Sequence, residues 1–266
     1  MRAAAAIGVV LALVAVPVCA GEFEDGLKHY QGKDYANAIR TWKSAADRGS
    51  VPAQFTLGYM YEKGEGTTQD YKQALAWYQK AADRGYAAAQ TNLGSMYEKG
   101  QGLAPDIKQA VSWYEKAAAQ GEAEAQFNMG RMCQTGQVVE QDYKKAASWY
   151  QKAGAQGHVW AQSALGLMHE TAQGVDLDYR QAVFWYQKAA EQGDPMAQFD
   201  LGRIYETGQE GVAMDYVEAH KWWGIAAASG EDRARRNRSL VERLMTPEQL
   251  AEAKKRAELW LKAHRK

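Results

Sequence analysis

Apolar and aromatic residues recur along most of the chain at helical spacing. One such run comprises Tyr71, Ala74, Leu75, Trp77, Tyr78, Ala81 and Ala82. Offsets of three, four and seven residues place these side chains on one face of a helix, which Asp70 caps and Gly85 ends. A second amphipathic run, stopped by Gly100 and Gly102, comprises Ala88, Ala89, Leu93, Met96 and Tyr97. Strand-like alternation is absent, so the pattern predicts an all-α protein made of helix pairs.

The helix pair repeats every 36 residues. An aspartate precedes each copy at positions 34, 70, 106, 142, 178 and 215, and the last step of 37 has its extra residue in the loop 209–211. The copies read WYQKAADRG at 77–85, WYEKAAAQG at 113–121, WYQKAGAQG at 149–157 and WYQKAAEQG at 185–193. Periods of roughly 20–50 residues indicate stacked units, because one short helix pair cannot bury its apolar face alone. A reactive group is needed once per site and a packing group once per repeat, so we interpret the WY block as a packing motif.

The repeat resembles the Sel-one-like repeat family, a relative of the tetratricopeptide repeats. The helix before each WY block appears as AQFTLGYMYEKGEG from 53, AQTNLGSMYEKGQG from 89, AQFNMGRMCQTGQV from 125, AQSALGLMHETAQG from 161 and AQFDLGRIYETGQEG from 197. The match covers residues 34–230, and the segment 26–39 is similar to the half-repeat that opens such chains. The resemblance implies a right-handed superhelical solenoid of antiparallel helix pairs. It also implies work as a scaffold or adaptor, often in bacterial envelopes and in signalling or secretion control.

The first twenty residues, MRAAAAIGVVLALVAVPVCA, have the layout of a secretory signal peptide. Arg2 precedes an apolar stretch that is too short to span a bilayer, and small residues end it. We predict cleavage after Ala20, export to the periplasm or the medium, and no transmembrane segment in the mature chain. A lipoprotein signal with lipid on Cys19 is the rival interpretation, and Val18 fits it poorly. Residues 21–33 are then an N-terminal capping helix, and 34–230 are a solenoid of five to six repeats.

Residues 231–266 depart from the repeat and are predicted to form basic C-terminal capping helices. They hold 11 Lys and Arg against 6 Asp and Glu, whereas residues 21–230 hold 20 against 26. Thr246 and Gln249 form a capping box, with Pro247 at the first helical position. The side chains expected to cover the last repeat are Leu250, Ala253, Ala257, Leu259 and Trp260. A basic end can bind an anionic surface, but its interleaved acids favour a solvated cap, and no nucleic-acid partner is expected.

The chain offers little that resembles a catalytic or metal site. Cys133 follows Tyr61 and Tyr97 in one repeat column and precedes His169 and Tyr205, so we interpret it as a packing residue. Once Cys19 is removed it is the one cysteine left, which keeps an intermolecular disulfide open. The five histidines lack H-E-x-x-H spacing and cysteine pairs, so no zinc site and no other cofactor is predicted. The motifs G-x-S-x-G, S-x-x-K, S-D-N and K-T-G are absent as well.

Two columns that vary between repeats are candidates for partner recognition. One reads Thr56, Asn92, Asn128, Ala164 and Asp200, and the other reads Tyr59, Ser95, Arg131, Leu167 and Arg203. Residues three apart share a helix face, and the resemblance implies that this helix lines the concave groove of the solenoid. We predict that a protein or peptide partner contacts Thr56, Tyr59, Asn92, Ser95, Asn128, Arg131, Asp200 and Arg203. Constant glutamines at 54, 90, 126, 162 and 198, and acids at 62, 98, 170 and 206, are interpreted as capping or inter-repeat hydrogen-bonding groups.

The leading hypothesis is a non-enzymatic scaffold or regulatory adaptor of the bacterial cell envelope, which binds its partner on the concave face. The alternative is an enzyme, because cysteine-rich members of the resembled family are described as penicillin-binding or weakly β-lactam-hydrolysing. Those members carry a cysteine pair in each repeat, and this chain does not. A shared fold is also weak support for a shared activity.

Overall fold

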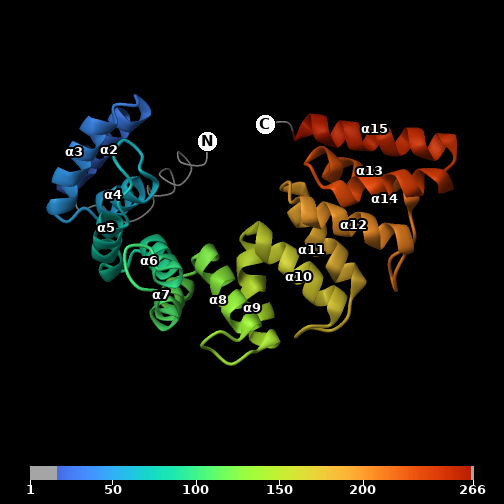
Figure 1. The fold of residues 1–266 in the computed structure, drawn as a ribbon, viewed down its shortest axis with the longest axis horizontal. Helices are drawn as coiled ribbons and strands as arrows, with labels where there is room; N and C mark the ends of the chain where they lie inside the picture. The colour runs from blue at the N-terminus through green and yellow to red at the C-terminus, as the bar shows by residue number, and fades with distance from the viewer. Residues whose placement is uncertain (1–16, 265–266) are drawn as a thin grey trace. The chain divides into compact units, whose positions relative to one another are not determined.

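The computed structural model describes residues 17–264, and within this range the chain is helical, with no β-strand. The helices fall into two compact units, Met1–Ala125 and Gln126–Lys266 (Figure 1). The all-α prediction is therefore confirmed. Most of the predicted signal peptide, residues 1–16, lies outside the described residues. In the described part of the chain, no helix is both long enough and apolar enough to cross a membrane.

Within each unit, consecutive helices from α2 to α7 and from α9 to α14 pack on one another, as the paired pattern predicts. The first unit contains α2 (Pro17–Gln31), α3 (Tyr35–Asp47), α4 (Val51–Lys63), α5 (Tyr71–Asp83), α6 (Ala87–Lys99) and α7 (Ile107–Ala119), and α8 (Ala123–Thr135) contains the boundary. The second unit continues with α9 (Tyr143–Ala155), α10 (Val159–Thr171), α11 (Tyr179–Glu191), α12 (Pro195–Thr207), α13 (Tyr216–Ala228), α14 (Asp232–Val241), the 3₁₀ turn η2 (Glu242–Leu244) and α15 (Pro247–Ala263).

The helices begin and end where the local signals place them. Asp70 accepts hydrogen bonds from the amides of Lys72 and Gln73 at the start of α5. The same cap occurs at Asp34, Asp106, Asp142, Asp178 and Asp215. Such a cap satisfies amides that have no partner inside the helix. The predicted capping box of Thr246 and Gln249 is also present at the start of α15.

The tyrosine of the WY block joins its own helix to the helix that precedes it in the chain. Tyr78 is fully buried, and its hydroxyl donates to Glu62 Oε2 at 2.8 Å. Equivalent bonds join Tyr114 to Glu98, Tyr150 to Gln134 and Tyr186 to Glu170. Counted from one capping aspartate to the next, three of the four recurring acids therefore hydrogen-bond to the following repeat, and for these three the inter-repeat interpretation is confirmed. The packing role of the WY block follows directly from this burial.

A helical glycine faces each of these tyrosines. A β-carbon on Gly166 would lie 2.6 Å from Tyr186 Cδ1 and Cε1, and the same close approach occurs at Gly58, Gly94 and Gly130. A carbon atom does not fit at that distance from a ring. The glycine of the L-G or M-G pair is therefore required by helix packing, because it lets the tyrosine lie directly on the neighbouring backbone.

The constant glutamines form a hydrogen-bond ladder between repeats. The Gln162 Nε2 donates to the Gly154 carbonyl at 2.9 Å, and its Oε1 accepts from Gln192 Nε2 at 2.8 Å. The other rungs join Gln120 to Gln90 and Gln156 to Gln126. Each of the constant glutamines is at most 6% exposed, so these bonds replace lost water contacts. The inter-repeat interpretation of the glutamines is confirmed.

Replacing Gln162 by alanine should remove both bonds and leave the Gly154 carbonyl and Gln192 without this partner. We expect a loss of about 1–3 kcal/mol in the free energy of unfolding, the usual cost of unpaired buried polar groups. Chemical denaturation followed by circular dichroism measures it. The control is Gln181→Ala on the exposed side of α11, which should change stability by less than about 0.5 kcal/mol. Equal effects of the two variants would show that the ladder contributes nothing.

The C-terminal helices α14 and α15 both pack on α13. Ala253 and Ala257 are buried, and the Trp260 ring lies 6.3 Å from that of Trp222. The predicted contact of Leu259 is wrong, because that side chain is 57% exposed. Leu261 packs against the core instead, since the covering face of α15 is rotated from the one that the sequence suggested.

Candidate functional site

In the first unit the variable columns lie on α4 and α6. Most of their side chains there are buried, partly buried or engaged by neighbouring groups. Thr56 is fully buried, and its hydroxyl donates at 2.9 Å to the carbonyl four residues before it. Asn92 lies beside the Tyr78 hydroxyl and partly offsets the burial that raises the pKa of that tyrosine. Tyr59 and Ser95 are half-buried. The prediction that a partner contacts Thr56 is therefore wrong, because this side chain is inaccessible. In this unit a partner can contact only the half-buried residues of the predicted surface.

In the second unit the same columns hold charged and amide groups at two separate places. On α8, Arg131 Nη2 donates to the Oδ1 of Asn128 at 3.4 Å. Asn128 is buried, so the prediction that it contacts a partner is corrected. On α12, Arg203 pairs with the carboxylate of Glu170 from α10, and its Nε lies 3.6 Å from Asp200 Oδ1. The charged cluster of Glu170, Asp200 and Arg203 therefore joins two successive repeats and has both signs of charge.

The electrostatics of this cluster are unfavourable for one of its carboxylates. Burial raises the pKa of Asp200 from 3.8 to about 6, although the nearby Arg203 opposes the shift. Burial also raises the pKa of Tyr186, which donates to Glu170 at 3.0 Å. Asp200 is thus a half-buried charge that its neighbours neutralise only in part. A cationic group of a binding partner can therefore pair with the Asp200 carboxylate.

Three exposed apolar side chains on the corresponding faces of α10 and α12 were not among the predicted partner-binding residues. Trp160 is 61% exposed on α10, and Met196 is 47% exposed at the equivalent position of α12. Leu167, which belongs to a variable column, is 45% exposed. Positions 160 and 167 are seven residues apart and so share a face. The sequence contained the signal, because the column four residues before the first one also varies: Pro52, Ala88, Glu124, Trp160 and Met196.

The position of Cys133 agrees with a packing role. Its side chain is 5% exposed and belongs to the apolar cluster around Tyr150 and Leu165. A reactive thiol needs an accessible, electropositive setting. His169, the next residue of the column, lies with Nδ1 3.3 Å from the Asp176 carbonyl. Among residues 17–264, no group of three or more His, Cys, Asp or Glu side chains is arranged to hold a metal ion.

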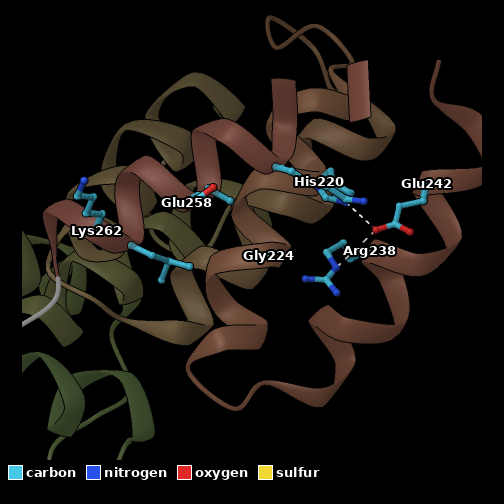
Figure 2. A pocket seen from close by; sticks show the side chains of 9 residues that line it. His220, Gly224, Arg238, Glu242, Glu258 and Lys262 are labelled. Carbon is cyan, nitrogen blue, oxygen red and sulfur yellow. Dashed lines mark hydrogen bonds and ion pairs between the residues drawn. The ribbon is translucent and has the colours of Figure 1, made fainter. Parts of the chain in front are cut away.

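A pocket of about 760 Å³ opens between α14 and α15 on the surface of α13. Its lining residues are His220, Gly224, Arg238, Glu242, Lys254, Ala257, Glu258, Leu261 and Lys262. Figure 2 shows the Glu242 carboxylate between His220 and Arg238, at 2.8 Å from His220 Nε2 and 3.8 Å from Arg238 Nε. Burial lowers the pKa of His220. The sequence did not predict this pocket, because it depends on how the capping helices cross α13.

The fold and the repeated contacts define the protein as an α-helical repeat solenoid. The profile described as Sel1 repeat matches residues 51–86, 87–122, 123–158, 161–194 and 195–231. The chain belongs to the Sel1 repeat family, and the resemblance noted in the sequence is confirmed. Proteins of this family are typically protein-interaction scaffolds, and the fold is in general not that of a catalyst.

Solved structures of related proteins agree with this assignment. A Sel1 repeat protein from Oxalobacter formigenes is 33% identical with a TM-score of 0.77, and the match covers 91% of this chain and 100% of that one. The antigen c5321 of uropathogenic Escherichia coli, described as protective and as having an SLR fold, is 29% identical with a TM-score of 0.67, over 92% of this chain and 60% of that one. The immunity protein Pa5087 of Pseudomonas aeruginosa shares the fold at 20% identity and a TM-score of 0.51, over 81% and 83%. No curated protein matches the chain.

Proposed function

We propose that this protein is a non-enzymatic scaffold of the bacterial cell envelope, which binds a protein or peptide partner on the variable face of helices α8, α10 and α12. The observation that carries the proposal is the exposed set Trp160, Leu167 and Met196 beside the charged residues Asp200 and Arg203. Large apolar side chains that remain exposed beside polar groups are typical of interaction sites.

The surroundings of Trp160 support this role. Its ring contacts Phe127 and His158, with centroid separations of 5.9 and 5.8 Å, and those two rings stack on one another at 4.6 Å. The indole is therefore held in place while most of its area stays accessible. A side chain that is ordered before binding loses little conformational entropy on binding, which favours it as an anchor.

The partner would use both parts of the surface. An apolar side chain of the partner covers Trp160 and Leu167, and a lysine or arginine pairs with Asp200, whose charge is poorly compensated. This complementarity supplies specificity, because a partner with an acid at that point is repelled.

In-cell photocrosslinking tests the proposal. A benzophenone amino acid is placed at 160, 167 or 196 on the proposed face, and at the exposed positions 144 and 151 of α9 as controls. We expect one recurring adduct in envelope fractions from the first three positions and none from the controls. The adduct from position 167 should disappear in a Trp160→Ala, Met196→Ala background without change in the unfolding midpoint. Labelling from the α9 positions alone would reject the face.

The proposed envelope location rests on the predicted signal peptide and is tested separately. We expect the mature chain to begin at Gly21 and to be found in the periplasm or the medium, whereas a chain without residues 1–20 stays in the cytoplasm. N-terminal sequencing of the fractionated protein decides. Retention of residues 1–20 on a cytoplasmic protein would overturn the envelope part of the proposal and leave the binding face untouched.

A further inference from the structure

The last repeat differs from the earlier ones at two positions that line the pocket between α14 and α15. His220 occupies a column that is otherwise apolar: Ile39, Leu75, Val111, Ala147 and Val183. Gly224 occupies a column that is otherwise polar and larger: Lys43, Gln79, Glu115, Gln151 and Gln187. Both exceptions face the same pocket, so the repeat pattern is broken where the pocket forms.

Packing does not require Gly224. A β-carbon there would lie 3.5 Å from the Ala257 β-carbon and 3.9 Å from Arg238 Cδ, which are ordinary contacts. The helical glycines that face tyrosine rings have no such room. A glycine in a helix interior is less favourable than alanine, because it loses more conformational entropy on folding. Its effect here is to keep the pocket floor open and apolar, beside Ala257 and Leu261.

The wall of the pocket has an excess of positive charge. Arg238, Lys254 and Lys262 line it against the carboxylates of Glu242 and Glu258. Glu242 is already engaged by His220 and Arg238. His220 is 2% exposed, and its Nδ1 is buried without a hydrogen-bond partner among the described residues. A buried polar atom without a partner is uncommon and costly, and here it lies in a residue that borders a cationic cavity.

We propose that this pocket binds an organic carboxylate with a short apolar stem. The carboxylate pairs with the guanidinium of Arg238 and the ammonium of Lys254, and the stem covers Gly224, Ala257 and Leu261. Guanidinium groups bind carboxylates through paired charge-assisted hydrogen bonds. A volume of about 760 Å³ is within the range of small-molecule sites, roughly 300–1,000 Å³. The carboxylate belongs either to a free small acid or to the C-terminus of a peptide.

Calorimetric titration of the full mature chain distinguishes these sources. The probes are hexanoate, acetyl-Ala-Leu with a free carboxylate, and the same peptide as its C-terminal amide. Binding of both acids with no binding of the amide identifies a general carboxylate site. Binding of the peptide acid alone identifies a peptide C-terminus. Equal heats from the peptide acid and the amide, or no heat from either acid, would overturn the proposal.

Variants connect the binding to the pocket. Gly224→Gln restores the residue of the earlier repeats and should abolish binding, while Gly224→Ala leaves the fold intact as a packing control. Lys254→Gln should weaken binding of the peptide acid by about tenfold or more, as expected for the loss of one charge-assisted contact. Lys255→Gln, on the adjacent exposed position of α15, should leave the affinity unchanged. Unaltered binding in Gly224→Gln and Lys254→Gln would place the carboxylate elsewhere.

Discussion

Replacing Gly166 by alanine should destabilise the protein by about 2–3 kcal/mol, although alanine is the better helix former. The added methyl group would lie 2.6 Å from two ring atoms of Tyr186. That ring is 1% exposed and its hydroxyl is tied to Glu170, so it has little freedom to move. The overlap therefore outweighs the gain of about 0.5–1 kcal/mol in helix propensity. Urea unfolding followed by circular dichroism measures the loss.

The matched control is the same substitution at another helical glycine. Gly224→Ala adds a methyl group that would meet its nearest neighbour at 3.5 Å, so we expect stability to stay equal or to rise by about 0.5–1 kcal/mol. Opposite signs at the two positions would identify ring contact as the cause. If Gly166→Ala is neutral, the tyrosine does not lie tightly on the neighbouring helix and the packing account of the WY block fails.

Replacing Asp200 by asparagine should stabilise the protein at neutral pH. The pKa of Asp200 is about 6 in the fold against 3.8 for the free group, so the native state binds its proton more tightly than the unfolded state does. Stability then falls as the pH rises from about 4 to 6, and at pH 7 the ionised carboxylate costs at most about 3 kcal/mol. Asparagine keeps the shape and removes this cost, so the gain should be present at pH 7 and absent at pH 4.

Denaturation of both proteins at a series of pH values checks this, with exposed Asp176→Asn as the control, for which we expect a change below about 0.5 kcal/mol. A destabilised Asp200→Asn variant at pH 7 would mean that the ion pair with Arg203 outweighs the cost of burial. If the partner proposed above supplies a cation, the same variant should also weaken its binding while it stabilises the free protein. Binding of the partner would then explain why the destabilising carboxylate of Asp200 is present.

The helix pairs and their caps could be predicted because their causes are local. An aspartate satisfies amides two and three residues away, and the apolar pattern marks the buried face of each helix. The repeat also multiplies every signal, so a weak cue in one copy is confirmed by the next. The Asp34 to Asp215 caps and the Thr246 capping box therefore lie where the sequence placed them.

The candidate sites were harder, because exposure depends on contacts between helices. Thr56 and Asp200 belong to one column, and only the first is fully buried. The position in the column shows which face of the helix a side chain occupies. The size of the side chain and its neighbours determine how much of it stays exposed. The pocket on α13 depends on where α14 and α15 cross it, and these helices have no repeat pattern to predict their placement. The exchange of an apolar residue for His220 was nevertheless visible in the sequence.

The glutamine ladder runs in one direction along the array of repeats, and this affects how such chains can change in length. Counted from one capping aspartate to the next, each rung joins a glutamine of one repeat to the repeat that follows it, with the same atoms each time. Gln54 and Gln198 stand at its two ends, where Arg84 and Ser229 replace the donor glutamine, and their Oε1 atoms have no partner among the described residues. A duplication or deletion of 36 residues between these ends re-forms identical rungs at the junction. Genes of this kind can gain or lose a whole repeat in one recombination event without any compensating substitution, and relatives of unequal length are the natural outcome.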